Sequence, residues 1–271
     1  MTHERGNEMG ARALRRLLWA VLTITAVMAW FGQAWVWAQE QHAADGQDIV
    51  TTAADGAKVF GTAYFGDLPA DAPLILLFHQ ARSNGRGEYG PLIGWLNGLG
   101  FRVIAWDQRS GGGLYGSANR TVAARGGGTG YCRAYPDLEA ALAYARAHYH
   151  PRKLLVWGSS YSGGLVFKLA AQHGDEIDGV VAFSPAFAVC GTNRDWRKVR
   201  LPILVVWPDT EAGNRYVSNT ITGLREKGAQ VIVVRHGRHG SSTLVDSRTG
   251  HDMSRYRQAV AAALRQLVAQ P

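Results

Sequence analysis

The sequence predicts an α/β fold with a mostly parallel central sheet and helices on both of its faces. Three observations support this class. Short apolar runs alternate with longer segments of helical character along most of the chain. The inner apolar runs contain no polar alternation, which is typical of strands that are buried on both faces. Several helical segments end at a glycine or a proline, namely Gly100, Pro151 and Gly174.

The elements follow in order along the chain. Two extended runs on either side of Asp55-Gly56 predict an antiparallel hairpin, which makes the sheet mixed. The apolar runs that predict buried strands are 73–79, 101–107, 153–158, 179–184, 202–207 and 230–235. The segments that predict helices are 88–100, 136–150, 164–174, 215–228 and 252–269. Residues 108–135 are rich in glycine and lack periodicity, so they form either a loop that covers a substrate or a plain insertion.

The N-terminal 38 residues do not fit this pattern. Arg12, Arg15 and Arg16 precede an uncharged run of 22 residues from Leu17 to Ala38, which ends in small residues before a polar start. This order predicts a signal peptide, while the length of the run also permits an uncleaved membrane anchor. We therefore expect residues 39–47 to be a tether and residues 48–271 to be a folded domain outside the cytoplasm, in the periplasm or the extracellular space.

Composition narrows the function. The chain has 271 residues and is 46% hydrophobic and 18% charged, which is ordinary for a globular protein with a sizeable core. Its net charge of +8 is scattered, and nucleic-acid binding would favour a clustered basic patch. We expect a solvated basic surface, with a preference for anionic substrates as the weaker interpretation.

The two cysteines, Cys132 and Cys190, both lie in the part predicted to be exported. An oxidising compartment permits a disulfide between them, but sequence alone leaves their pairing open. No C-x-x-C spacing is present, and we predict neither a metal nor a cofactor.

The stretch LLVWGSSYSGG, residues 154–164, predicts where a nucleophile would lie. A strand, a tight turn and a helix form a nucleophile elbow of the type G-x-S-x-G. With Gly158 as the leading glycine, Ser160 is the nucleophile and Ser162 occupies the second glycine position. The alternative frame makes Ser162 the nucleophile but lacks the leading glycine. The first frame also places the Tyr161 N–H at the start of the helix, where it can stabilise an oxyanion.

On this elbow and on the order of strands and helices, residues 48–268 resemble the α/β-hydrolase fold family, and its dienelactone hydrolase-like members in particular. The resemblance implies a second oxyanion donor in the loop after strand 73–79, at Ala81 or Gln80. It implies a structural role for His79. Asp107 and Arg109 resemble the family's D-x-R turn and are expected to do no chemistry. The connection 185–202 has only 18 residues, so no lid domain is expected.

The resemblance also implies the chain order Ser, acid, His. His239 is the expected base in the loop before the last helix, with His236 and His251 as alternatives. The acid is expected after strand 202–207, where Glu211 aligns with the family's aspartate and Asp209 is the alternative. Glutamate can orient a histidine as aspartate does.

We therefore predict an exported serine hydrolase that cleaves a carboxylic ester, lactone or thioester through Ser160, His239 and Glu211. The expected partner is a small-molecule or polymer-attached ester-like substrate, and no nucleic acid. Contact with a membrane is expected only through the N-terminal segment, if that segment is uncleaved. The alternatives are a serine peptidase or amidase of the same fold and a non-catalytic binding domain.

Overall fold

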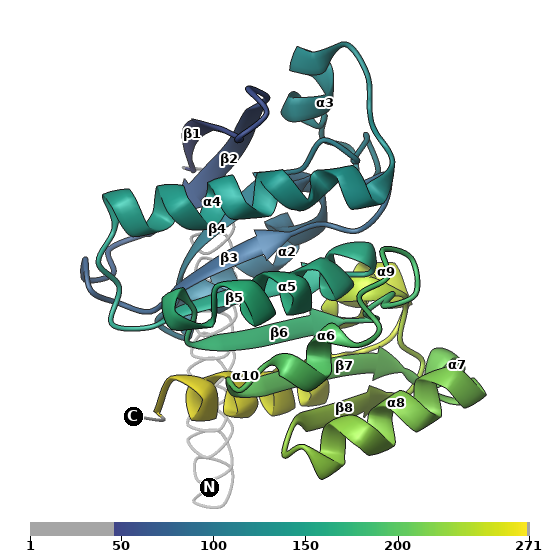
Figure 1. Ribbon diagram of the computed structural model, residues 1–271. Helices are drawn as coiled ribbons and strands as arrows, with labels where there is room; N and C mark the ends of the chain where they lie inside the picture. Colours follow the sequence, from purple (N-terminus) through teal and green to yellow (C-terminus); the bar gives the residue numbers. More distant parts are fainter. Residues whose placement is uncertain (1–45, 270–271) are drawn as a thin grey trace, which may run out of the picture. The chain divides into compact units, whose positions relative to one another are not determined.

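The computed structural model describes residues 46–269, and within them eight strands form one sheet in the order β1-β2-β4-β3-β5-β6-β7-β8 (Figure 1). The strands are β1 (Gln47–Thr52), β2 (Lys58–Tyr64), β3 (Leu74–Phe78), β4 (Arg102–Asp107), β5 (Leu154–Ser159), β6 (Gly179–Phe183), β7 (Ile203–Pro208) and β8 (Gln230–Val234). All pairs from β4 through β8 are parallel, whereas β1 pairs antiparallel with β2 and β2 with β4. The predicted mixed, mostly parallel sheet with an N-terminal antiparallel hairpin is confirmed.

The hairpin turn depends on one glycine. Gly56 has φ +81°, and its N–H donates to the carbonyl of Ala53. A side chain at such a backbone conformation would be strained, so glycine is favoured there. The Asp55-Gly56 pair is therefore a turn signal that the sequence shows directly.

The core lies around the inner strands. Every residue of β3, β4, β5, β6 and β7 is buried, which explains why these runs lack polar alternation. Trp157 and Phe183 stack between neighbouring strands with ring centroids 4.7 Å apart. Burying one such large apolar side chain contributes about 2–3 kcal/mol to the free energy of folding.

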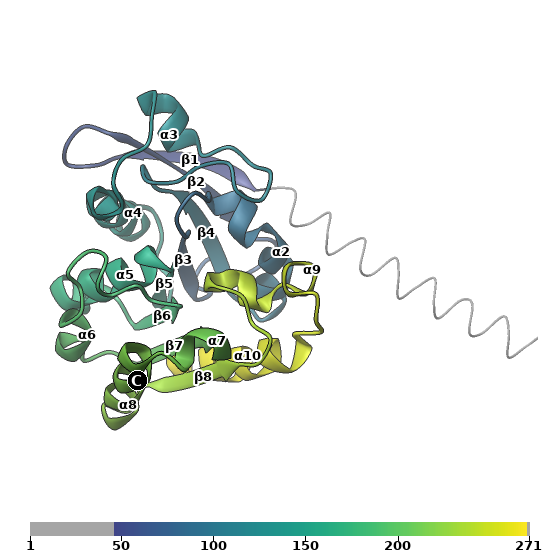
Figure 2. The same ribbon diagram turned by 90° about the vertical axis from the view of Figure 1, so that its right-hand side faces the viewer.

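Helices cover both faces of the sheet. Helices α4, α5 and α8 lie on one face and α2 and α10 on the other (Figure 2). The helices are α2 (Gly85–Gly98), α3 (Arg120–Arg125), α4 (Tyr135–His148), α5 (Tyr161–Gln172), α6 (Asp195–Lys198), α7 (Asp209–Ala212), α8 (Arg215–Glu226), α9 (Asp246–Thr249) and α10 (Ser254–Ala269), with 3₁₀ turns η1 (Tyr131–Ala134), η2 (Gly174–Glu176) and η3 (Gly240–Leu244). The connection between β6 and β7 contains only the short α6.

Helix α2 begins three residues before the predicted start at 88. Asn84 is its N-cap, because its side chain accepts a hydrogen bond from the Gly87 N–H at 2.7 Å. The first turn contains two glycines, so its propensity is low and the sequence did not indicate a helix there.

Pro91 lies inside α2 and cannot donate to the carbonyl of Gly87. The Arg248 guanidinium replaces the missing donor, because it donates to the carbonyls of Gly87 and Glu88, the latter at 2.7 Å. A side chain from α9 therefore holds the first turns of α2 in place.

The segment 108–135 is anchored to the rest of the fold. The Asn84 amide donates to the carbonyls of Gly112, Leu114 and Ser117. Asn119 caps α3 through its Oδ1, which accepts from the Val122 N–H at 2.8 Å. The Asn84 hydrogen bonds join residues distant in sequence, so the glycine-rich sequence showed no periodic signal for them.

A disulfide joins Cys132 to Cys190 with their Cα atoms 5.2 Å apart. It connects η1 to the segment that follows β6. Next to it, the Tyr131 ring stacks on the Tyr161 ring of α5 with centroids 5.0 Å apart. The pairing that sequence left open therefore fastens the 108–135 segment beside the first residue of α5.

The predicted signal or anchor at 1–38 and most of the tether at 39–47 lie outside the described residues. Among residues 46–269, no helix is both long enough and apolar enough to cross a bilayer.

The double variant Cys132→Ser, Cys190→Ser should unfold about 4 kcal/mol more easily, since the bridge closes a loop between residues 58 apart in sequence. Urea unfolding of the oxidised protein and the variant measures this difference. Adding reductant should destabilise the wild type but leave the variant unchanged, and equal midpoints for the oxidised pair would contradict the expectation.

Candidate functional site

The turn between β5 and α5 has the geometry of a nucleophile elbow. Ser160 adopts φ 59° and ψ −121°, a conformation that non-glycine residues rarely occupy. Its N–H donates to the carbonyl of Phe183 at 2.8 Å, and its own carbonyl accepts from the Ala186 N–H at 3.0 Å. These two backbone hydrogen bonds therefore stabilise the strained conformation of Ser160. The residue is 8% exposed, so its hydroxyl reaches the surface of a cavity.

Close backbone packing explains the small residues of the elbow. A Cβ on Gly158 would lie 2.2 Å from the carbonyl oxygen of Ser162, and one on Gly163 would lie 2.9 Å from the Cα of Pro185. Ser162 is fully buried, and its hydroxyl donates to the His79 carbonyl at 2.7 Å while it accepts from the Gln108 amide at 2.6 Å. The Ser162 hydroxyl is thus occupied by hydrogen bonds beneath the site, whereas Ser160 lines the cavity.

His239 and Glu211 come together at the carboxyl end of the sheet. The His239 Nδ1 lies 2.7 Å from the Glu211 Oε1. The hydrogen bond to Glu211 is the main reason that the pKa of His239 is raised, and it exceeds the opposing effect of burial. Half of the His239 side chain is exposed, and it lines the same cavity as Ser160.

The alternative residues have other partners. Asp209 starts α7, and its carboxylate accepts from the Thr210 N–H at 2.9 Å. The rings of His236 and His251 stack on each other with centroids 4.6 Å apart. Within the described residues, neither histidine forms a hydrogen bond with a carboxylate through its side chain. The structure therefore brings Glu211, and not Asp209, to His239.

Two backbone N–H groups near Ser160 are candidate oxyanion donors. Tyr161 is the first residue of α5, so its N–H has no acceptor within the helix. The Gln80 N–H is occupied, because it donates to the Glu88 Oε2 at 2.6 Å. The Ala81 N–H has no acceptor among residues 46–269, and Ala81 lines the cavity. Of the two donors that the sequence left open after β3, Ala81 is the one that is free.

His79 is fully buried and makes three contacts. Its Nδ1 lies 2.8 Å from the Gln80 carbonyl, and its Nε2 accepts from the Gln108 N–H at 2.9 Å and lies 3.2 Å from the Asn119 amide. Burial lowers its pKa, so the ring is neutral at ordinary pH. Through these contacts His79 joins the loop after β3 to the segment after β4, which is a structural role.

Asp107 and Arg109 also anchor structure. Asp107 accepts from the Gly85 N–H at 2.8 Å and pairs with Arg120. Arg109 pairs with the buried carboxylate of Asp137 and with Asp55 in the hairpin turn. Both residues therefore join the segment after β4 to its surroundings.

Two cavities meet at His239. The first, of about 450 Å³, contains Ser160 and is lined by Gln80, Ala81, Arg82, Leu114, Tyr115, Ser160, Arg238 and His239. The second, of about 370 Å³, is mostly apolar and lies on the Glu211 side, lined in part by Phe187, Val189, Trp207, Tyr216 and Val217. Arg82 and Arg238 are both exposed, and in the described part of the chain neither forms a salt bridge.

Sequence reasoning missed Arg82, Tyr115 and Arg238 as lining residues and Glu88 as a buried neighbour of the site. These residues lie on loops or in the first turn of a helix, and their positions depend on contacts distant in sequence. Glu88 in an otherwise apolar helical segment was the one available signal.

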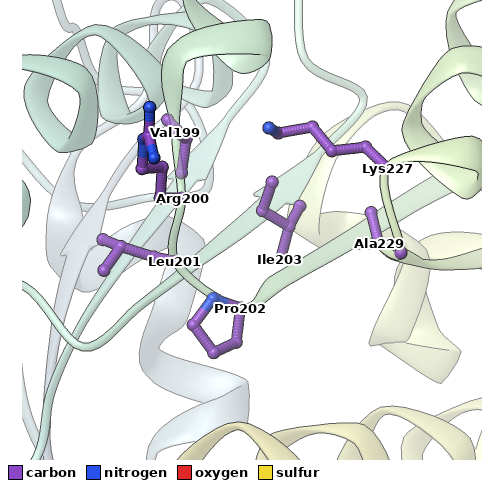
Figure 3. A pocket seen from close by; sticks show the side chains of 8 residues that line it. Val199, Arg200, Leu201, Pro202, Ile203, Lys227 and Ala229 are labelled. Atoms are coloured by element: carbon purple, nitrogen blue, oxygen red, sulfur yellow. The ribbon is translucent and has the colours of Figure 1, made fainter.

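A further cavity, of about 230 Å³, lies at the amino end of β7, away from Ser160. Figure 3 shows its lining, with Arg200, Pro202, Ile203 and Lys227 among the labelled side chains. The Lys227 ammonium donates to the Arg197 carbonyl at 3.1 Å. None of its lining residues is a nucleophile or a carboxylate, and no group of metal-ligating side chains occurs within residues 46–269.

Comparison with known proteins identifies the family. Residues 72–262 match the family described as serine aminopeptidase, S33. No curated protein matches the chain. The esterase Est1E from Butyrivibrio proteoclasticus superposes with a TM-score of 0.64 at 15% identity, covering 82% of this chain and 99% of that one. An esterase from Pyrococcus furiosus gives 0.61 at 16% identity, with 83% and 91% covered. A predicted CIB-like hydrolase from Thermoplasma acidophilum gives 0.56 at 20% identity, with 82% and 98% covered.

At these identities the solved structures show a shared fold, which confirms the α/β-hydrolase resemblance. The family match extends over most of the chain and includes the elbow, the Glu211 loop and the His239 loop. The protein is therefore an α/β-fold hydrolase that belongs to the serine aminopeptidase S33 family.

Proposed function

We propose that this hydrolase acts outside the cytoplasm and cleaves a carboxylic ester, lactone or thioester with Ser160 as nucleophile, His239 as base and Glu211 as the acid that orients it. One observation carries the proposal. A strained serine and a histidine paired with a carboxylate line the same cavity, and a free N–H lies beside them.

The reaction follows from these positions. The His239 Nε2 accepts the Ser160 proton while the Ser160 Oγ attacks the carbonyl carbon. The N–H groups of Ala81 and Tyr161 stabilise the oxyanion, and the α5 dipole adds to this effect. When the intermediate collapses, His239 returns the proton to the departing alkoxide or thiolate. His239 then deprotonates a water that attacks the acyl-enzyme, which releases the acid and restores Ser160.

The family's description makes an aminopeptidase the natural second candidate. Recognition of a substrate's free ammonium group calls for an available carboxylate near the nucleophile. Among the residues that line the two cavities, Glu211 is the one carboxylate, and it is bound to His239. Arg82 and Arg238 would repel a cationic substrate, so the charges favour an ester-like substrate over an N-terminal peptide.

The same charges favour a substrate with a negative group. Two exposed arginines line the same cavity as Ser160, and neither of them forms a salt bridge with a carboxylate among the described residues. The second cavity offers aromatic and aliphatic surface through Phe187, Trp207 and Val217. One solved structure of Est1E contains bound ferulic acid, an aromatic acid. We infer a substrate with one anionic part and one apolar or aromatic part.

Export is supported by two independent features. The basic and apolar order of residues 1–38 is that of a signal or anchor. The Cys132–Cys190 disulfide suits an oxidising compartment.

Ser160→Ala should abolish labelling by a fluorophosphonate probe and reduce hydrolysis of nitrophenyl esters by at least about 10³-fold, because the nucleophile is removed. Ser162→Ala is the matched control and should still be labelled, since its hydroxyl is buried beneath the elbow. Normal labelling of Ser160→Ala would exclude Ser160 from this role. Wild-type protein without labelling or hydrolysis would favour a non-catalytic domain.

Glu211→Gln should lower kcat by about 10²–10⁴-fold, because the amide no longer orients His239 or stabilises its imidazolium. Glu211 raises the pKa of His239, so its replacement should lower that pKa. The acid limb of the kcat/KM profile should therefore move to lower pH. Asp209→Asn serves as the control, and a larger effect there than at Glu211 would contradict the assignment.

The double variant Arg82→Gln, Arg238→Gln should raise KM about tenfold for a nitrophenyl ester of a dicarboxylic acid, since two exposed ion pairs contribute roughly 0.5–1 kcal/mol each. KM for the neutral ester of equal length should change little, and added salt should reduce the difference. Arg225→Gln, on the exposed side of α8, is the control. Equal changes for both esters would refute a charge preference.

A further inference from the structure

A buried carboxyl group lies directly behind the site. Glu88 is in the first turn of α2 and has no exposed surface. Its Oε2 accepts from the Gln80 N–H at 2.6 Å, and its Oε1 has no hydrogen-bond partner among residues 46–269. A buried carboxyl group is costly to desolvate, so its retention in an otherwise apolar helix face calls for a role.

Glu88 lies where three segments of the site meet. Gln80 belongs to the loop that follows β3. The Ser159 hydroxyl, next to the nucleophile, is near enough to lower the pKa of Glu88, and it also accepts from the Ser241 N–H at 3.0 Å. Gly240 follows His239, and a Cβ on it would lie 2.3 Å from the Ser159 Oγ and 2.6 Å from the Gln80 Oε1. The oxyanion loop, the elbow and the histidine loop therefore pack on one another around this carboxyl group.

The position of Glu88 is itself fixed. The Arg248 guanidinium donates to the carbonyls of Gly87 and Glu88, and the Gly87 carbonyl is the one that Pro91 leaves without its normal helical donor. Tyr115 lies over the same guanidinium at 3.7 Å, and its hydroxyl accepts from the Gln80 amide at 3.0 Å. This arrangement keeps the carboxyl group pointing at the Gln80 backbone.

The hydrogen bond from Gln80 to Glu88 also affects the orientation of the next peptide unit, between Gln80 and Ala81. The Gln80 carbonyl is turned inward, toward His79 Nδ1 at 2.8 Å and the Ser83 N–H at 3.2 Å. In a trans peptide the N–H points opposite to the carbonyl, so the Ala81 N–H is directed away from these groups. Ala81 lines the cavity that contains Ser160. The direction of the Ala81 N–H thus depends on the hydrogen bonds of the Gln80 N–H to Glu88 and of the Gln80 carbonyl to His79 and Ser83.

We propose that Glu88 is a positioning residue for the oxyanion hole, which binds the Gln80 N–H and thereby aims the Ala81 N–H at the oxyanion formed on Ser160. The proposal rests on the function proposed above. Glu88 touches neither substrate nor the reacting atoms, and it acts through the backbone of Gln80 and Ala81.

The charges around Glu88 are consistent with this role. Burial raises its pKa to about 6, while Ser159, the Gln80 N–H, Arg248 and His239 act in the opposite direction. Its negative charge also contributes to the raised pKa of His239. The neighbouring Tyr89 and Tyr161 hydroxyls have pKa values raised mainly by burial and are neutral.

The test compares Glu88→Ala and Glu88→Gln with the wild type, with Glu226→Gln on the exposed end of α8 as the control. Each protein is titrated with a fluorophosphonate, so that kcat is counted per reactive Ser160. Glu88→Ala leaves the Gln80 N–H without its acceptor, and kcat should fall about 30–100-fold while KM changes less than twofold. Glu88→Gln keeps an acceptor oxygen and should restore most of kcat.

The inhibition constant Ki of a boronic acid provides a second measurement, which should not change if Glu88 only stabilises the fold. The boronic acid forms a tetrahedral adduct with the serine, so it depends on the oxyanion donors as the transition state does. In Glu88→Ala its Ki should rise by a factor similar to the loss in kcat, and Glu88→Gln should reverse this rise.

The outcomes are separable. If Glu88→Ala lowers the melting temperature but leaves kcat per labelled site and the boronate Ki unchanged, the positioning role is overturned and the proposed function stands. If Glu88→Gln is as impaired as Glu88→Ala, the hydrogen bond to Gln80 is not the cause and the proposal is likewise overturned. A wild-type protein that neither labels nor hydrolyses esters overturns both proposals together.

Discussion

The site depends on the strained backbone of Ser160. A side chain at φ 59° and ψ −121° costs about 1–3 kcal/mol and persists only where the surroundings hold it. Here the Ser160 N–H is bound by the carbonyl of Phe183 in β6, and its carbonyl accepts from Ala186 beyond the same strand. The parallel pairing of β5 with β6 therefore fixes the backbone of Ser160, because it brings these groups to the same edge of the sheet.

The same constraint explains the small residues around the elbow. The chain leaves β5 and enters α5 with almost no space, so Gly158 and Gly163 each face backbone or proline atoms at distances that a Cβ could not meet. Ser162 fits where the family has glycine because its hydroxyl is bound by His79 and Gln108. A polar side chain is tolerated at this buried position since both of its hydrogen-bonding functions are satisfied.

Beneath the cavity, polar groups replace an apolar core. Glu88, Ser159, Gln80 and Ser241 are all buried, and they connect the loops after β3, β5 and β8. Such a network directs backbone N–H groups more sharply than apolar packing does, because hydrogen bonds depend on angle as well as distance. Above it, the arginines and the aromatic residues divide the open surface into a cationic part and an apolar part.

The sequence by itself determined the fold class, since buried parallel strands need continuous apolar runs and the hairpin needs Asp55-Gly56 at its turn. It also located the elbow, because the Gly158 and Ser160 spacing is a local requirement of the strand-to-helix turn. Other features depend on residues far apart in the chain. The family resemblance named Glu211 and His239, each with alternatives. Their contact, the occupied N–H of Gln80 and the burial of Glu88 were decided only when β3, β5, β7 and β8 placed their loops at one edge of the sheet. Local periodicity carries no information about such contacts, whereas hydrogen-bond geometry in the folded chain does.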